Sequence, residues 1–359
     1  MAQTDLLVQG IGAVAGILIE ELANHYKKQQ KSRKRKIWTR KWILRRKEQG
    51  TSDNFLREVE KEDKDTYKNH LRLSSEQFDY LLQKVTPKIQ KEDTLMRPAI
   101  PARTKLQISL RYLATGDSFS SLESSYRVPK SSMSKFLPEV LDAIYEGLEE
   151  YIQVTDWPHF YDFYNYEGYF STVLLALVDS NYCFTFIDVG SQGRVNDSSI
   201  FNNSILKRKL ENGTLNFPTW GVILGDEAFP LKKYLMKPYS RRLPLTTEEK
   251  ISNYRLSRAR RIVENAFGIM VMKFRIYRTP IYVCPVKVDK IVKATCALHN
   301  WLIMTSTRYY APTGVMDSDD IDGSWRLEPR SSYLRREFTQ TVIALVLERG
   351  RTHNIILNS

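Results

Sequence analysis

Two carboxylates, Asp226 and Glu264, lie in settings that could support metal chemistry. Asp226 follows the apolar run Val222–Leu224 and a glycine, which is typical of a buried strand that delivers a carboxylate at its carboxyl end. Glu264 lies in a run with helical spacing, at the border of an apolar stripe that includes Val263 and Phe267. Because hard divalent cations prefer oxygen ligands, a strand-end carboxylate and a carboxylate on a packed helix could share one cation.

The same residues also have a simpler interpretation. A Gly-Asp pair after a strand often forms only a turn. Glu264 could equally form ordinary charge pairs with Arg260 and Arg261 on the surface of a helix. The spacing alone leaves both the metal site and these structural roles open.

The positive charge of the chain is concentrated near its N-terminus. The chain has 359 residues and a formal net charge of +13. Residues 27–49 hold twelve Lys and Arg against Glu48 alone, so about +11 lies in this segment. Part of it resembles a nuclear-import or nucleic-acid-contacting run, and the residues predicted to contact DNA are Arg33, Lys34, Arg35 and Lys36. A merely solvated run of charges is the alternative.

The composition favours a globular protein of a reducing compartment. Hydrophobic residues make up 42% of the chain and aromatic residues 11%, enough for two domains and a substantial core. Cys183, Cys284 and Cys296 lack the spacing of a metal site, which argues against a disulfide scaffold. Leu6–Ile19 is apolar but shorter than the ~20 residues of a membrane span, and it lacks a basic n-region. We therefore expect a packed helix there, with neither a signal peptide nor a membrane partner.

Helical spacing over residues 51–152 predicts a helical region that binds DNA, behind an N-terminal segment of residues 1–50. Ser118–Tyr126 and a second helix that begins at Lys130 are separated by the turn Arg127–Pro129, which is the outline of a helix-turn-helix. The start of the second helix carries side chains of the types that contact phosphates and base edges, namely Lys130, Ser131, Ser132, Ser134 and Lys135. Two helices that merely pack together are the alternative.

Residues 153–306 alternate between strand and helix patterns, which favours an α/β domain with a mixed sheet. The expected strands are Phe170–Val178, Tyr182–Val189 and Val222–Gly225. The expected helices are Asp197–Leu210, Leu231–Met236, Glu248–Phe274 and Val286–Thr305. Residues 307–359 are expected to form an acidic tail and then a last helix over Tyr333–Leu347.

Five sequence blocks are distinctive in combination: Gly193–Asp197, Leu224–Leu231, Asn253–Arg260, Val263–Gly268 and Leu298–Asn300. Together they resemble the PIF/Harbinger transposases and the nucleases derived from them, over Leu106–Ile303. The resemblance implies an RNase H-like domain in which three acidic residues hold two divalent metals, Mg²⁺ or Mn²⁺, behind a helical DNA-binding region. It also implies DNA as the substrate, a Myb/SANT-like partner protein and a location in the nucleus. Asp226 matches the second of the three acidic residues and Glu264 the third.

The chain departs from this family where the first strand and its catalytic Asp should lie. Only Tyr161–Tyr164 separates the entry block Trp157–Phe160 from the block Asn165–Gly168. The first strand has been deleted in the gene or dropped by a gene model that skipped a segment, and Asp162 or Asp179 would have to replace its carboxylate. We therefore expect impaired catalysis.

The missing strand also affects the expected fold. In an RNase H-like sheet the first strand lies between the second and the fourth, here Phe170–Val178 and Val222–Gly225. Strands that are about 10 Å apart cannot share backbone hydrogen bonds. Either His159–Tyr166 is recruited as a makeshift strand, or the sheet splits. We favour the second outcome and expect a poorly stable, aggregation-prone domain, because exposed apolar strand edges pair with other chains.

These observations predict a nuclear, DNA-binding, Harbinger-derived nuclease. Its metal-dependent reaction would be phosphodiester hydrolysis or strand transfer on DNA, and it would be impaired. The alternative is a catalytically inactive protein that keeps the scaffold and binds DNA. A scaffold without any role on DNA is disfavoured, since it leaves the basic N-terminal run and the Lys130 helix unexplained.

Overall fold

The computed structural model describes residues 20–22, 39–94, 98–154, 172–192, 197–214, 221–279, 281, 283–310 and 342–348. The chain divides into two compact units, Met1–Leu44 and Arg45–Ser359. The described part of the first unit includes the short helix α2 (Lys41–Leu44). The apolar run Leu6–Ile19 and the predicted DNA contacts Arg33, Lys34, Arg35 and Lys36 lie outside the described residues.

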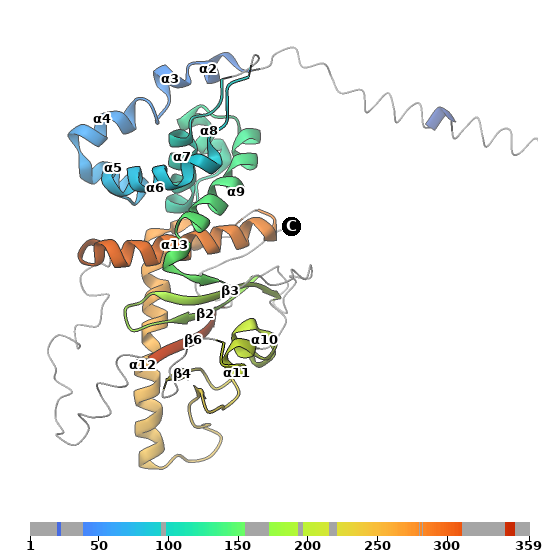
Figure 1. The fold of residues 1–359 in the computed structure, drawn as a ribbon, viewed down its shortest axis with the longest axis vertical. Coiled ribbons are helices and arrows are strands. Elements are labelled where there is room, and N and C mark those ends of the chain that lie inside the picture. The colour runs from blue at the N-terminus through green and yellow to red at the C-terminus, as the bar shows by residue number, and fades with distance from the viewer. Residues whose placement is uncertain are drawn as a thin grey trace, which may run out of the picture. The chain divides into compact units, whose positions relative to one another are not determined.

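Residues 45–147 of the second unit are largely helical (Figure 1). The helices are α3 (Arg46–Gln49), α4 (Phe55–Glu62), α5 (Lys64–Leu71), α6 (Ser75–Ile89), α7 (Ala102–Thr115), α8 (Phe119–Tyr126) and α9 (Lys130–Gly147). The boundaries follow from local chemistry: Ser74 and Gln77 form a capping box at the start of α6. Gly116, with φ of 72°, ends α7 in the left-handed conformation that glycine favours.

The two helices predicted around the turn Arg127–Pro129 form where the sequence places them. Arg127 ends α8 with a φ of 53°, and Pro129 precedes the first turn of α9. One face of α9 is buried in the core, with Met133 and Val140 almost fully covered. α9 also pairs Asp142 with Lys290 of α13 (Pro285–Tyr310), which ties the helical region to the helices of the sheet domain.

The described strands form one six-stranded sheet, in the order β1-β3-β2-β6-β4-β5. Their bounds are Gln153–Val154 for β1, Thr172–Val178 for β2, Phe184–Gln192 for β3, Val222–Leu224 for β4, Leu235–Met236 for β5 and Val342–Glu348 for β6. β2 is antiparallel to β3, whereas β1 runs parallel to β3 and β4 parallel to β5. The predicted mixed α/β sheet is confirmed.

The gap predicted at the centre of this sheet is filled by β6. This strand pairs antiparallel with β2 and parallel with β4, so the split sheet expected from the sequence does not occur. The helix predicted over Tyr333–Leu347 is wrong for residues 342–347, because they form β6. The physical reason is that two strands with unpaired edges accept an apolar, β-branched run such as Val342–Val346. His159–Tyr166, the other expected filler, lies outside the described residues.

Helices cover both faces of the sheet (Figure 1). On one face, α10 (Asp197–Asn203) and α11 (Ile205–Glu211) bury Phe201 and Leu206 with the strand residues Leu175 and Ile223. On the other face, α12 (Thr247–Lys273) and α13 pack against β2 and β3. This three-layer arrangement explains why β2 reads as a continuously apolar run, since both of its faces are buried.

Two expected helices have different structures. The helix predicted over Asp197–Leu210 is interrupted at Ser204, whose hydroxyl accepts a hydrogen bond from Lys207 N at 3.2 Å and begins α11. The short helix predicted over Leu231–Met236 is wrong, because this segment pairs with the edge of β4: Gly225 N donates to Met236 O at 2.8 Å. No helix in the described part of the chain is long and apolar enough to cross a membrane.

Candidate active site

The carboxyl end of β4 presents Asp226 in a tight turn. Gly225 allows a close approach there, because a Cβ at this position would lie 3.0 Å from Cδ2 of the Phe229 ring and would fit only if the ring moved. Phe229 is buried and meets Phe201 edge-on at 5.9 Å between ring centroids. The Asp226 Oδ1 accepts a hydrogen bond from Ala228 N at 2.9 Å, as expected for the turn interpretation. The carboxylate itself is half-buried, so it remains able to bind a ligand from solvent.

The chain that follows β5 returns to α12 and is held there by Asn253. The side-chain amide of Asn253 accepts from Tyr239 N at 2.8 Å and donates to Tyr239 O at 3.0 Å. Thr246 and Glu249 form a capping box that fixes the start of α12. The backbone at Tyr239 is therefore held against the second turn of α12, and the Tyr239 side chain is 52% exposed.

A cavity of about 360 Å³ opens between the turn at Asp226, the segment around Tyr239 and α12. Its wall includes Asp226, Tyr239, Arg241, Ser257 and Arg260. The Arg260 Nε is buried and has no hydrogen-bond partner among the described residues. Asp226, Arg260 and Tyr239 thus bring a carboxylate, a guanidinium group and an aromatic ring to the wall of one open space. This combination suits a ligand that carries negative charge together with an apolar part.

Glu264 lies on α12 four residues after Arg260, which is about 6 Å further along the same face of the helix. Its side chain is exposed, and it is not part of the wall of the cavity. The structure thus places Asp226 with Arg260 and leaves Glu264 one turn beyond them. Among the described residues, no three His, Cys, Asp or Glu side chains gather into a metal site. The oxygen donors that remain are of the type that Mg²⁺ and Mn²⁺ accept, but two carboxylates hold a divalent cation more weakly than three.

Two other carboxylates of the sheet are tied to the fold. The Asp179 Oδ1 accepts hydrogen bonds from Asn181 N and Cys183 N, both at 2.9 Å, and so shapes the turn between β2 and β3. Asp188 lies in β3 with 3% of its surface exposed. Burial raises its pKa to about 6, although Lys293 and Arg208 act in the opposite direction. Asp162, the remaining substitute considered from the sequence, lies outside the described residues.

The predicted DNA contacts at the start of α9 differ in how exposed their side chains are. Lys130, Ser131 and Lys135 are exposed, whereas Ser132 and Ser134 are half-buried. Lys130 Nζ donates to Ser120 Oγ at 3.2 Å. Ser134 is engaged within the protein, because its Oγ and its carbonyl oxygen both accept hydrogen bonds from Lys287 Nζ of α13. Ser131 and Lys135 therefore present the side chains best placed to reach an outside ligand.

The block Leu298–Asn300 has a structural role that its sequence alone does not indicate. Asn300 Oδ1 accepts from Phe184 N at 2.8 Å, and its Nδ2 donates to the carbonyl oxygens of Phe184 and Tyr151, both at 2.7 Å. His299 is fully buried, contacts Tyr182 O through Nε2 at 2.9 Å, and has a pKa lowered to about 4 by burial. These two side chains fix the start of β3 on α13.

Sequence reasoning missed Arg260, Tyr239 and Asn253 as parts of the site. Arg260 and Asn253 both lie in one of the five distinctive blocks, which is the signal that could have found them. Tyr239 lies outside every block, and only the hydrogen bonds to Asn253 bring it to the cavity.

Comparisons with known proteins agree with the sequence blocks. Residues 149–300 match the family model described as DDE superfamily endonuclease. The chain is 23% identical over 295 residues to Protein ALP1-like of Arabidopsis thaliana, covering 67% of this chain and 71% of that protein. It is 21% identical over 262 residues to Putative nuclease HARBI1 of Mus musculus, covering 62% of this chain and 74% of that protein. No solved structure matches the chain. The predicted resemblance to Harbinger transposase-derived nucleases is confirmed.

Proposed function

We propose that this chain is a nuclear, DNA-binding nuclease of the Harbinger-derived type, which cleaves phosphodiester bonds with impaired activity. The observation that carries the proposal is the cavity at the carboxyl end of β4, where Asp226 and Arg260 border the same open space. Chemistry in open α/β sheets is commonly placed at such strand ends. Both groups suit a phosphodiester: a guanidinium group binds its negative charge, and a carboxylate binds the cation that assists its cleavage.

Different residues of the site would bind the phosphate and the metal ion. Arg260 would bind a non-bridging phosphate oxygen, because it lines the cavity and its Nε has no acceptor among the described residues. Asp226 would hold Mg²⁺ or Mn²⁺, with Glu264 as the second ligand, reaching back from one turn further along α12. A bound ion would polarise the phosphoryl group and lower the pKa of water. The turn from Gly225 to Phe229 orients Asp226, because the Ala228 amide occupies one side of its carboxylate.

An RNase H-like topology is part of this proposal, with β6 in place of the missing first strand. Support comes from the order β3-β2-β6-β4-β5 and from the directions of the pairings, antiparallel with β2 and parallel with β4. α12, which carries Glu264, packs on the same sheet. The carboxylates would then reach one edge of the sheet from separate elements.

We assign DNA binding to the basic N-terminal run and to the start of α9 as a helix-turn-helix. The run contributes Arg33, Lys34, Arg35 and Lys36, and α9 contributes Lys130, Ser131, Ser132, Ser134 and Lys135. Basic side chains neutralise backbone phosphates, and short polar side chains contact phosphates and bases. A Myb/SANT-like protein is the proposed partner on DNA.

A catalytically inactive DNA-binding protein is the second candidate function. It is favoured by the sequence, which supplies Asp226 and Glu264 but lacks the block that would carry a third catalytic carboxylate. With one carboxylate ligand fewer, the site has a lower affinity for a metal ion. The repulsion between the two remaining carboxylates is then less neutralised. The nuclease and the inactive DNA-binding protein would share the fold and the DNA-binding surface. They differ in whether a phosphodiester bond of the DNA is cleaved.

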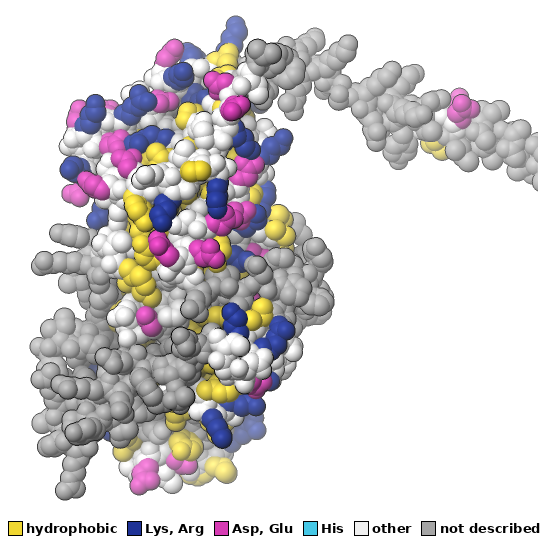
Figure 2. Space-filling view, in the orientation of Figure 1, with side chains coloured by type: hydrophobic (Ala, Val, Ile, Leu, Met, Phe, Trp, Pro, Cys, Tyr) yellow, Lys and Arg dark blue, Asp and Glu magenta, His cyan; other side chains and the backbone are white. Residues whose placement is uncertain are grey.

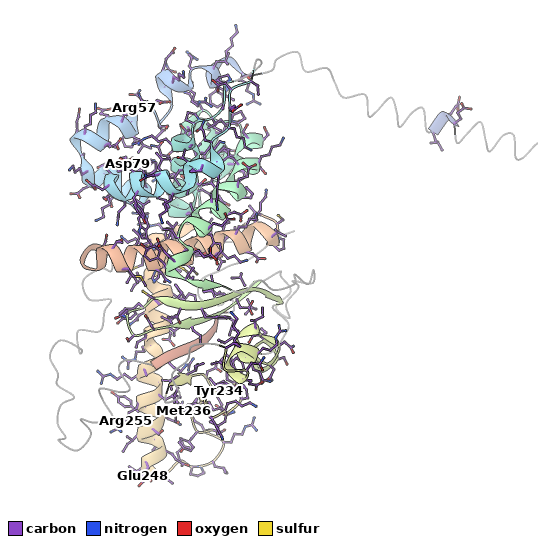
Figure 3. All side chains as sticks on the ribbon, viewed as in Figure 1. Arg57, Asp79, Tyr234, Met236, Glu248 and Arg255 are labelled. Atoms are coloured by element: carbon purple, nitrogen blue, oxygen red, sulfur yellow. The ribbon has the colours of Figure 1, made fainter. Side chains whose placement is uncertain are left out.

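Supercoiled plasmid and Mn²⁺ calorimetry distinguish the candidates. We expect slow plasmid nicking and weak Mn²⁺ binding by the chain, both reduced in Asp226→Asn and in Glu264→Gln. Glu248→Gln is the matched control, since Glu248 is exposed at the start of α12, far along the helix from Glu264 (Figure 3). Nicking or Mn²⁺ heats that are the same in all three variants would refute the assignment. DNA binding without any nicking would establish the inactive alternative.

A further inference from the structure

We infer that the cavity beside Asp226 binds one nucleotide of a locally unpaired DNA strand, with its phosphate at Arg260 and its base against Tyr239. The inference rests on the proposed function, since it assumes that DNA reaches this end of the sheet. It adds to that function a requirement on the substrate: the strand must be open where it enters the site.

The phosphate position follows from Arg260. Arg260 lines the cavity, and its Nε has no hydrogen-bond acceptor among the described residues. The guanidinium group carries further N–H donors, so it can bind a ligand that accepts hydrogen bonds without breaking a bond that Nε makes within the described part of the protein. A guanidinium group binds phosphate oxygens through paired hydrogen bonds that match their geometry. Arg241 lines the same cavity and is exposed, so it adds positive charge at the entrance.

The base position follows from Tyr239. The ring is 52% exposed although it lines the cavity, and such a surface on a large aromatic side chain is available for stacking. The two hydrogen bonds from Asn253 hold the backbone of Tyr239, which reduces the ordering needed when a base binds. Stacking on an aromatic ring tolerates every base, because each base has a flat π face.

The cavity has room for one nucleotide but not for a base pair. A volume of about 360 Å³ lies near the lower end of the range for small-molecule pockets, about 300–1,000 Å³. It suits one nucleotide and is far too small for a base pair within a duplex. A base that enters must leave its stack, as in enzymes that act on extruded nucleotides. A strand that is already unpaired avoids this cost, so it should bind more tightly.

The surroundings of the cavity are mixed apolar and basic, as expected near single-stranded DNA. Leu231, Met236 and Leu243, in the segment between Asp226 and α12, are exposed large hydrophobic residues. Lys232, Lys233 and Arg242 are exposed within the same stretch of chain. In the lower half of the view in Figure 2, the coloured side chains include both basic and hydrophobic ones, with acidic and other side chains between them.

The test compares two duplexes of one sequence, one fully paired and one with a three-nucleotide bulge that carries 2-aminopurine. Binding is measured with the full chain in EDTA, so that cleavage does not consume the probe. We expect the bulged duplex to bind at least 10-fold more tightly, with quenching of the 2-aminopurine as its base stacks on Tyr239. Tyr239→Ala should lower the affinity for the bulge on the order of 10-fold and remove the quenching. Tyr239→Phe should retain both properties.

Two matched controls separate the cavity from the surrounding surface. Tyr254→Ala removes another exposed tyrosine from α12 that is not part of the cavity wall, and we expect no change. Arg260→Met should weaken binding of the bulge and reduce the salt slope by about 0.7, the value for one single-strand phosphate contact. Arg255→Met should have a smaller effect, since Arg255 is exposed and lies on the side of α12 away from Tyr234 and Met236 (Figure 3).

The outcomes distinguish this inference from the proposed function. Equal affinity for paired and bulged DNA, with Tyr239→Ala and Tyr254→Ala indistinguishable, would overturn the inference while leaving DNA binding intact. Absence of DNA binding by the full chain would overturn both. Tyr239 and Arg260 variants that retain the cooperative thermal melt of the unaltered chain show that any decrease in binding comes from the cavity and not from unfolding.

Discussion

Removal of β6 should unfold the sheet domain. A chain that ends after residue 341 lacks the strand that lies between β2 and β4. The register contains five residue pairs with β2 and three with β4. At about 1 kcal/mol for each pair of hydrogen-bonded residues, the decrease in stability is about 8 kcal/mol. A domain is stabilised by about 5–15 kcal/mol in total, so little stability would remain.

Urea unfolding followed by tryptophan fluorescence and by far-UV circular dichroism measures this effect. We expect the chain that ends after residue 341 to lack a cooperative transition of the sheet domain and to aggregate, because β2 and β4 would expose apolar edges. A chain that ends after Glu348 is the control, since it lacks a C-terminal segment but keeps β6. Equal midpoints and equal slopes for the two shortened chains would refute the reasoning, and would show that β6 does not contribute to the stability of the sheet.

Two further predictions concern charge. Removal of residues 1–44 takes away nine Lys and Arg but leaves the second unit whole. The log–log slope of DNA affinity against salt concentration should fall by about 0.9 for each phosphate that these residues neutralise. An unchanged slope in a fluorescence-anisotropy titration would contradict this prediction. Asp188→Asn should stabilise the protein at pH 7 by up to about 3 kcal/mol, because the pKa of Asp188 is raised from 3.8 to about 6 in the folded state. The folded state then keeps a proton that the unfolded state releases between pH 4 and 6, so stability falls as pH rises through this window. Thermal melts at pH 4, 5, 6 and 7 should show this fall in the unaltered chain and a weaker one in Asp188→Asn.

Local patterns in the sequence were sufficient for most helices and for the position of Asp226. Ser74 as a helix cap, Gly116 as a helix end and the apolar run of β4 each depend on neighbouring residues alone. The segment Leu231–Met236 could not be assigned in this way, because its structure is decided by the edge of β4, which supplies the partners for its backbone. Tertiary pairing overrides helix propensity at such places.

Local sequence patterns were also insufficient to predict β6 and the cavity. Residues 342–347 are apolar enough for either a helix or a strand, and only the open position between β2 and β4 selects the strand. Asp226 and Glu264 were predicted to act together, yet the side chain that borders the cavity with Asp226 is Arg260. The hydrogen bonds between Tyr239 and Asn253 span 14 residues, and no periodic pattern indicates an interaction of this kind.

β6 completes the sheet but does not replace the catalytic carboxylate that the resemblance implies. In the parallel pairing with β4, Ala344 lies level with Leu224. The residues of β6 that pair with β4 are Val342, Ile343 and Ala344, and none of them is a carboxylate. β6 thus supplies the backbone partners that β2 and β4 require, but the part of β6 that pairs with β4 brings no carboxylate to the site. The sheet can therefore be complete while the site has one carboxylate fewer than the resemblance implies, and this is the physical basis for expecting a stable domain with impaired cleavage.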